Sequence, residues 1–300
     1  MIHNLMNNNI NRSDRNALIN FIKKSDYFTN GKKVKEFEKK WSKWLGVKYS
    51  VFVNSGSSAN LLTISYLKTL YKSGEIILSP LNWVSDVTSV LYNGFKPRFV
   101  DINLSNLAMN TEKIIQNINK NTRAILLTHI LGFNGLDEKL LKICKKKKII
   151  LIEDVCESHG AKFKKKKLGC YGLISNFSFY YAHHLSTIEG GMLCTNDKMT
   201  YEKLRIMRGH GMLRESTHNL FKKKIIKKYS DLNEKFIFIE PGYNFRSTEL
   251  NAVIGINQLK RLDKNNKLRN KNNYCFLSNL DKKKYINKFD LNGSSNYAFV

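Results

Sequence analysis

The sequence has few prolines, no repeat and no long apolar run. Its 3 prolines in 300 residues, together with the absence of any Pro/Gly/Ser-rich stretch, leave no sign of a flexible linker. No apolar segment reaches the roughly 20 residues that a membrane-crossing helix needs. The N-terminal MIHNLMNNNINRSDRN also lacks the apolar stretch of a secretory signal. With a hydrophobic fraction of 42%, the sequence predicts a globular, cytoplasmic protein.

Cysteines are also scarce, and they are scattered along the chain. None lies at CxxC or another spacing typical of metal ligands, and an odd number of scattered thiols is typical of a reducing compartment. The sequence therefore predicts neither a structural zinc nor an iron–sulfur cluster, and no other metal site. The five residues are Cys144, Cys156, Cys170, Cys194 and Cys275.

Acidic residues are outnumbered by basic ones, 24 to 51, which gives a formal net charge of +27. Such a charge is common in nucleic-acid-binding proteins. Here, however, the lysines fall in separate runs without an arginine-and-aromatic stripe, and no nucleic-acid module is recognisable. The abundance of Asn and Ile beside Lys indicates a codon bias, so we interpret the lysines as solvated surface and expect no nucleic-acid partner. A positive potential would still attract a substrate that carries a diphosphate.

Short apolar segments alternate with segments of helical spacing. Helices are predicted over 57–72 and 111–119, between apolar segments that are typical of buried strands. This alternation predicts an α/β fold around a mainly parallel sheet. Ligands of such sheets bind at the carboxyl ends of the strands. The predicted strands are 49–53, 76–79, 98–101, 124–128, 149–153, 176–180 and 192–195.

The last third of the sequence changes character. A highly charged stretch over 214–235 predicts a surface excursion, and a helix is predicted from 248 to about 262. The final residues, 296–300, are apolar and resemble a strand. We expect residues 1–255 to form a large domain and 256–300 to begin a small C-terminal domain that the sequence leaves incomplete.

The turn Asn54-Ser55-Gly56-Ser57 directly follows a predicted strand and opens a predicted helix. Backbone N–H groups at such a turn, with the helix N-terminus behind them, suit a phosphate dianion. The alternative is an ordinary serine helix cap.

An acid and an aromatic residue follow two other strands. Asp154 ends the apolar run IILIE, where a buried carboxylate needs a cationic or hydrogen-bonding partner, such as a protonated pyridinium. A helix N-cap is the alternative. Trp83 follows the strand at 76–79, where it would either stack on a flat ligand or lie in the core.

Two adjacent histidines, His183 and His184, lie in a loop between FSFY and a Glu-Gly-Gly turn. A histidine pKa near neutrality suits proton transfer. A metal site is less favoured, because vicinal histidines point apart and no HExxH-like partner is present. A structural hydrogen bond of a loop histidine is the remaining alternative.

In this order, SGSSAN, ED with a downstream GA, FSFY, EGG and GYNFRSTELNAVIG resemble the DegT/DnrJ/EryC1/StrS sugar aminotransferase family. The likeness runs from about residue 28 to residue 262. It implies the fold type I of pyridoxal phosphate (PLP) enzymes, like aspartate aminotransferase, with a seven-stranded sheet and a smaller α+β domain. It also implies a homodimer with a shared site. The implied cofactor contacts are Gly56, Ser57 and Ser178 to the phosphate, Trp83 on the ring, Asp154 at the ring nitrogen, Glu157 beside the ring, and Asn244 to the phosphate in the partner subunit.

The departure from the family pattern is His183, which stands where a lysine would bind the cofactor covalently. The lysine-lacking branch with two loop histidines resembles the dehydratases that use pyridoxamine phosphate (PMP) and remove the C3 hydroxyl of a nucleotide-linked 4-keto-6-deoxy sugar. One subtype holds an iron–sulfur cluster on several cysteines, but between His184 and Asn244 this sequence has only Cys194.

The resemblance therefore favours the cluster-free, GDP-linked subtype, with L-glutamate as amino donor, in dideoxysugar synthesis for lipopolysaccharide O-antigen. His183 would be its catalytic residue. Two alternatives stay open: a sugar aminotransferase that recruits another lysine, and a non-catalytic binding protein on a PLP-enzyme fold.

Overall fold

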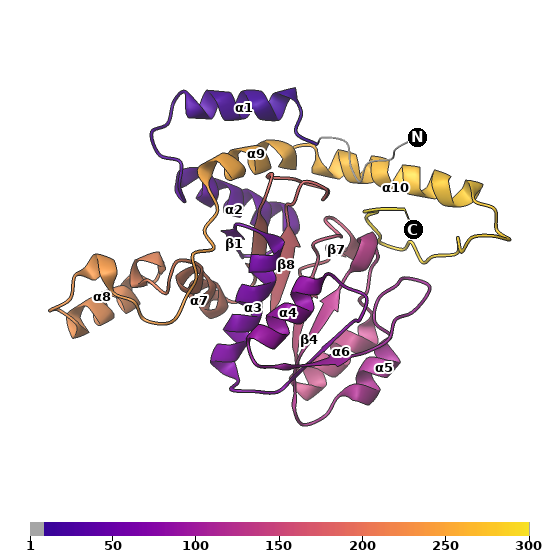
Figure 1. The fold of residues 1–300 in the computed structure, drawn as a ribbon, viewed down its shortest axis with the longest axis horizontal. Helices are drawn as coiled ribbons and strands as arrows, with labels where there is room; N and C mark the ends of the chain where they lie inside the picture. Colours follow the sequence, from indigo (N-terminus) through magenta and orange to yellow (C-terminus); the bar gives the residue numbers. More distant parts are fainter. Residues whose placement is uncertain (1–8, 300) are drawn as a thin grey trace.

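A seven-stranded sheet runs through the centre of the computed structural model, which describes residues 9–299 (Figure 1). The strand order is β1-β9-β8-β5-β4-β2-β3, and only β9 runs antiparallel to its neighbours, β1 and β8. The predicted α/β fold with a mainly parallel sheet is confirmed. The strands are β1 Tyr49–Val53, β2 Glu75–Leu78, β3 Lys96–Phe99, β4 Thr122–Thr128, β5 Ile150–Asp154, β8 Ile174–Ser178 and β9 Gly191–Thr195, with a separate hairpin of β6 Lys162–Phe163 and β7 Lys166–Lys167.

Helices cover both faces of this sheet, so most of its strands are buried on both sides. In β1, Val51 and Val53 pack into one core cluster with Leu62 of α3, whereas Phe52 packs into the other with Phe37 of α2. Double burial explains why the strands read as continuous apolar runs. The helices are α1 Arg12–Ile22, α2 Lys32–Leu45, α3 Gly56–Leu70, α4 Val84–Tyr92, α5 Thr111–Asn117, α6 Glu138–Lys147, α7 Lys198–Arg208, α8 Asn219–Lys228, α9 Glu249–Leu259 and α10 Leu262–Asn279, with short 3₁₀ turns η1 Ile130–Gly132, η2 Leu213–Glu215 and η3 Glu234–Phe236.

The helices expected from the sequence are present at α3, α5 and α9. The charged stretch 214–235 contains α8, which has no buried residue and projects from the body of the molecule (Figure 1). The division between residues 255 and 256 falls within α9 and stays a prediction. Within residues 9–299, none of the helices combines the length and apolarity that crossing a membrane requires.

The strand expected at 296–300 is wrong for residues 296–299, which form no strand, and residue 300 lies outside the described residues. Instead, this segment lies against the turn η1. The backbone N–H of Ser295 donates to the carbonyl of Gly132 over 2.8 Å, and that of Tyr297 donates to the carbonyl of Leu131 over 3.2 Å. Because its partner is a turn and not a sheet edge, the apolar segment stays irregular.

Candidate active site

A cavity of about 570 Å³ opens where β4, β5 and β8 end. The last residues of these strands, Thr128, Asp154 and Ser178, all line it. The cavity therefore lies at the carboxyl edge of the sheet, as expected for an α/β fold. Its other lining residues are Ser55, Gly56, Ser57, Asn60, Trp83, Ser85, Ile130, Cys156, Glu157, Tyr180, His183, Glu189 and Tyr297.

All but one of the site residues expected from the sequence meet in this cavity. The exception is Asn244, which is exposed, does not line the cavity, and accepts a hydrogen bond from Nε of Arg246 over 3.1 Å. It nevertheless lies close to the turn that opens α3, because the N–H of Asn54 donates to the carbonyl of Phe245 over 3.0 Å. The roles assigned to these residues stay predictions.

The turn that opens α3 is both a helix cap and a candidate anion site. Ser55 is the N-cap residue, and its hydroxyl accepts a hydrogen bond from the N–H of Ser58 over 3.0 Å. A Cβ on Gly56 would lie 2.5 Å from Cβ of Ser178, so only glycine lets the turn pack against the end of β8. This contact places the hydroxyl of Ser178 beside the α3 N-terminus, an arrangement that suits a phosphate.

Asp154 is a buried carboxylate at the cavity, with only 3% of its surface exposed. Its Oδ1 accepts from the N–H of Cys156 over 2.8 Å, and its Oδ2 lies 3.0 Å from Nδ2 of Asn60. Among residues 9–299, no lysine, arginine or histidine forms an ion pair with it. The helix-cap alternative is wrong, because turns and not a helix follow β5. A protonated ring nitrogen fits this unpaired carboxylate.

Trp83 and Glu157 form parts of the cavity wall. Trp83 is 66% exposed, so it is not a core residue, and its indole remains available for stacking. Glu157 is half-buried and accepts a hydrogen bond from the N–H of Leu131 over 2.7 Å. Burial raises the pKa of the Glu157 carboxyl above its usual value, and the neighbouring Asp154 adds to the effect.

The two adjacent histidines point to different surroundings. His183 lines the cavity, and its Nδ1 is buried without a hydrogen-bond partner in residues 9–299. His184 does not line it, and its Nε2 lies 3.1 Å from the carbonyl oxygen of Ser295. The structural hydrogen bond is therefore observed for His184, whereas proton transfer by His183 stays a prediction.

Burial lowers the pKa of His183 to about 4, against a smaller opposing effect of Asp154; Arg269 lowers it further. At neutral pH the His183 ring is therefore uncharged and able to accept a proton.

Several lining residues were not expected from the sequence, and Tyr297 is the most informative. Its ring centroid lies 5.3 Å from that of His183, with 37° between the ring planes. Its carbonyl accepts a hydrogen bond from Nη1 of Arg269 over 3.0 Å. In the sequence, Tyr297 is recognisable only as part of an apolar segment. Its contact with the histidine loop joins distant parts of the chain, so local sequence patterns do not predict it.

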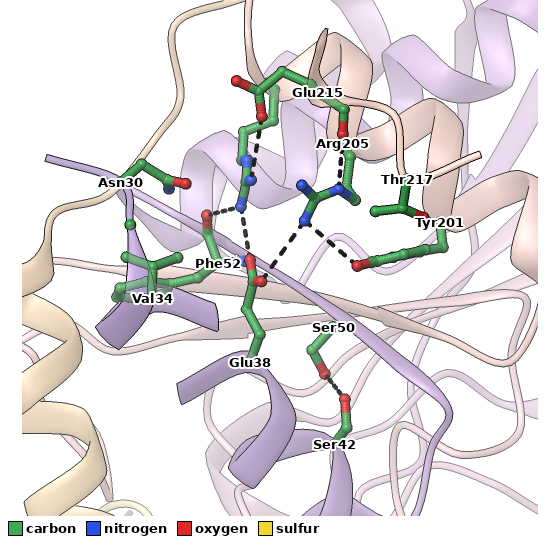
Figure 2. Close-up of polar contacts among 12 residues, drawn as sticks. Asn30, Val34, Glu38, Ser42, Ser50, Phe52, Tyr201, Arg205, Glu215 and Thr217 are labelled. Carbon is green, nitrogen blue, oxygen red and sulfur yellow. Dashed lines mark hydrogen bonds and ion pairs between the residues drawn. The ribbon is translucent and has the colours of Figure 1, made fainter. Parts of the chain in front are cut away.

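A buried ion-pair network holds the strand that leads into the α3 turn (Figure 2). Oε1 of Glu38, in α2, accepts from Nη1 of Arg208 over 2.7 Å and from the N–H of Phe52 over 2.9 Å. The Arg208 guanidinium also donates to the carbonyl of Phe52 over 2.9 Å, and Arg205 Nη1 lies 3.9 Å from Oε2 of Glu38. The Phe245 N–H donates to the Arg208 carbonyl, so the network joins β1, α7 and the segment that carries Asn244.

The fold and the cavity define a PLP enzyme of fold type I. Residues 9–299 match the DegT/DnrJ/EryC1/StrS aminotransferase family, and the chain belongs to this family. This confirms the resemblance found in the sequence motifs.

Within the family, the chain is similar to GDP-4-keto-6-deoxy-D-mannose 3-dehydratase of Escherichia coli O55:H7. The two are 37% identical over 281 residues, which cover 91% of this chain and 71% of that protein. A crystal structure of a variant GDP-4-keto-6-deoxymannose-3-dehydratase with bound GDP-perosamine superposes with a TM-score of 0.90 at 35% identity, covering 99% of this chain and 78% of that one. Another, with a trapped PLP-glutamate geminal diamine, gives 0.89 at 33% identity and covers 99% and 78%.

Proposed function

We propose that this chain is a PLP/PMP-dependent 3-dehydratase that removes the C3 hydroxyl of GDP-4-keto-6-deoxymannose, with L-glutamate as amino donor. The observation that carries the proposal is His183, an uncharged histidine at the cavity with an unpaired Nδ1. None of the described residues that line the cavity is a lysine. The names of the similar proteins support the same reaction, the same cofactor and the glutamate donor.

The cavity residues fit the cofactor in three places. The α3 turn offers its phosphate a helix N-terminus, the unpaired Asp154 suits its ring nitrogen, and the exposed indole of Trp83 suits its ring face. When bound, the cofactor supplies an electron sink for breaking the bond to the C3 oxygen. We assign Gly56, Ser57 and Ser178 to the phosphate, with Glu157 beside the ring.

His183 would move the proton. Its imidazole is not a primary amine, so it cannot hold the cofactor covalently as a lysine does. Because burial keeps the ring neutral, it is ready to accept a proton, and once protonated it can give that proton to the departing C3 hydroxyl. The product would be a 3,6-dideoxy-4-keto sugar, a building block for O-antigen.

Mass spectrometry of GDP-4-keto-6-deoxymannose incubated with the protein, PLP and glutamate tests this proposal. We expect loss of the C3 oxygen, with His183→Asn inactive and His218→Asn, at the N-cap of α8 outside the cavity, active. An aminosugar product would instead establish the aminotransferase alternative. Borohydride treatment gives a second readout, since a reduced phosphopyridoxyl-lysine would show that another lysine has been recruited.

We further propose a cytoplasmic homodimer in which Asn244 reaches the cavity of the partner subunit. Its exposure beside the α3 turn supports this assignment. Complementation provides the test: Asn244→Ala and His183→Asn should each be inactive alone. Mixed subunits should regain activity, because one of the two sites in a mixed dimer then has both residues. No recovery in verified mixed dimers would contradict the shared site.

A further inference from the structure

Asp86 is a second buried carboxyl group behind the cavity, and the mechanism above does not use it. It lies in the first turn of α4 with none of its surface exposed. Its Oδ1 lies 2.7 Å from Nδ2 of Asn60, and its Oδ2 accepts a hydrogen bond from the hydroxyl of Thr128 over 2.8 Å. A buried carboxylate with neutral partners alone is unfavourable, so its charge state needs a physical explanation.

The amide of Asn60 joins this carboxyl to that of Asp154. The hydroxyl of Thr63 donates to Oδ1 of Asn176, whose Nδ2 donates to Oδ1 of Asn60, and this network places the Asn60 nitrogen toward the acids. This nitrogen lies 2.7 Å from one carboxyl, 3.0 Å from the other and 3.1 Å from the hydroxyl of Ser85. An amide nitrogen carries two hydrogens, so it cannot satisfy three acceptors.

The titratable groups that face Asp86 are acidic. They are Asp154 at the end of β5, with Cys156 and Glu157 in the following turn, while α3 and β4 contribute the neutral Asn60 and Thr128. Within residues 9–299, no basic side chain forms an ion pair with either aspartate. Burial raises the pKa of Asp86 well above its usual value, and the neighbouring Asp154 adds to the effect. Two adjacent buried carboxyl groups relieve their repulsion by keeping one proton.

We propose that Asp86 is a positioning residue that keeps the one proton of the Asp86–Asp154 pair, so that a single negative charge faces the cavity from Asp154. The functional part of this proposal rests on the proposed cofactor. A protonated ring nitrogen would then meet one negative charge, and the aspartate pair and the ring nitrogen would be neutral together. An ionised Asp86 would leave an uncompensated charge in the same dry site.

Infrared spectroscopy of the cofactor-free protein at neutral pH, with ¹³C-labelled aspartate carboxyls, tests the protonation directly. We expect a label-sensitive C=O band of a protonated aspartic acid, lost in Asp86→Asn and kept in the exposed control Asp101→Asn. The band should persist when PLP is added. Absence of the band in the wild-type protein, its survival in Asp86→Asn, or its loss on PLP binding would each overturn the proposal. Because the first two readouts need no cofactor, they are independent of the proposed reaction.

The pH dependence of unfolding gives a second test. The unfolded chain releases the Asp86 proton above about pH 4, whereas the folded chain keeps it, so the wild-type protein loses stability relative to Asp86→Asn as pH rises. The ratio of the two folding constants should change by up to about tenfold per pH unit up to the pKa of the folded pair. A ratio that stays constant between about pH 4 and 7 would contradict a retained proton.

Discussion

Two buried polar clusters, one around Glu38 and one at the cavity, differ in how their groups are paired. Around Glu38, carboxylate and guanidinium lie 2.7 Å apart, and both also bond to the backbone of Phe52, although Nε of Arg208 has no hydrogen-bond partner within residues 9–299 (Figure 2). At the cavity, Asp154 lacks a cationic partner, and Nδ1 of His183 lacks any partner within residues 9–299. A matched buried pair fixes the architecture, whereas unmatched groups facing a cavity indicate a ligand site.

The comparison predicts the largest effect for His183→Asn, and at neutral pH this effect is on turnover alone. Loss of the proton-transfer group should lower kcat by about 10² to 10⁴-fold. The melting temperature should change little, because Nδ1 of His183 makes no hydrogen bond that the native state would lose. Steady-state kinetics beside thermal unfolding measures both quantities. A kcat within tenfold of wild type would mean that another group moves the proton.

Glu38→Ala should act in the opposite way, on stability. It leaves the guanidinium of Arg208, only 1% exposed, with only the more distant carboxylate of Glu215 at 3.9 Å, which costs up to about 3–5 kcal/mol. Urea unfolding should show a lower midpoint at an unchanged slope. Glu38→Gln is the matched control, since its amide oxygen still accepts from the N–H of Phe52. A Gln variant as stable as the wild-type protein would show that the charge contributes nothing.

The His183 ring should also make stability depend on pH. Above about pH 6.5 the ring is neutral in the folded and unfolded chains alike. Between that pH and the folded pKa of about 4, the unfolded chain binds a proton that the folded chain does not, so stability falls as pH falls. The loss amounts to as much as about 3 kcal/mol. In His183→Asn this contribution should vanish from a series of urea titrations, and an unaltered slope would contradict it.

Several of the proposed cofactor contacts were predictable, because they follow segments that could be recognised as apolar strands. Asp154 ends β5, and parallel strands bring such ends to one edge, whereas Ser178 ends β8 but lies inside the strand predicted over 176–180, so only the family resemblance indicated it. The position of His183 depended on the family resemblance, since nothing local separates it from His184. Their different contacts, a cavity for one and the Ser295 carbonyl for the other, arise only from tertiary packing.

Asp86 and Tyr297 were not predictable for a related reason. Asp86 lies in the first turn of a helix, where an acidic residue is common because it interacts favourably with the helix dipole. Its burial against Asp154 depends on how α4 packs on the sheet. The segment of Tyr297 has the composition of a strand, but its backbone bonds to a turn, which local periodicity cannot indicate.

Tyr297→Phe should have the smallest effect on activity of the substitutions considered. It tests whether a side chain of the cavity wall contributes to ligand binding. Burial raises the pKa of Tyr297 to about 12, so its hydroxyl stays protonated at neutral pH and can donate to a bound ligand. One such hydrogen bond contributes about 0.5–1.5 kcal/mol, so kcat/KM should fall by roughly two- to tenfold. Tyr297→Ala should cost more, because it also removes the ring packed beside His183. Equal losses in both variants would assign the whole effect to the hydroxyl, and no loss in either would remove Tyr297 from the site.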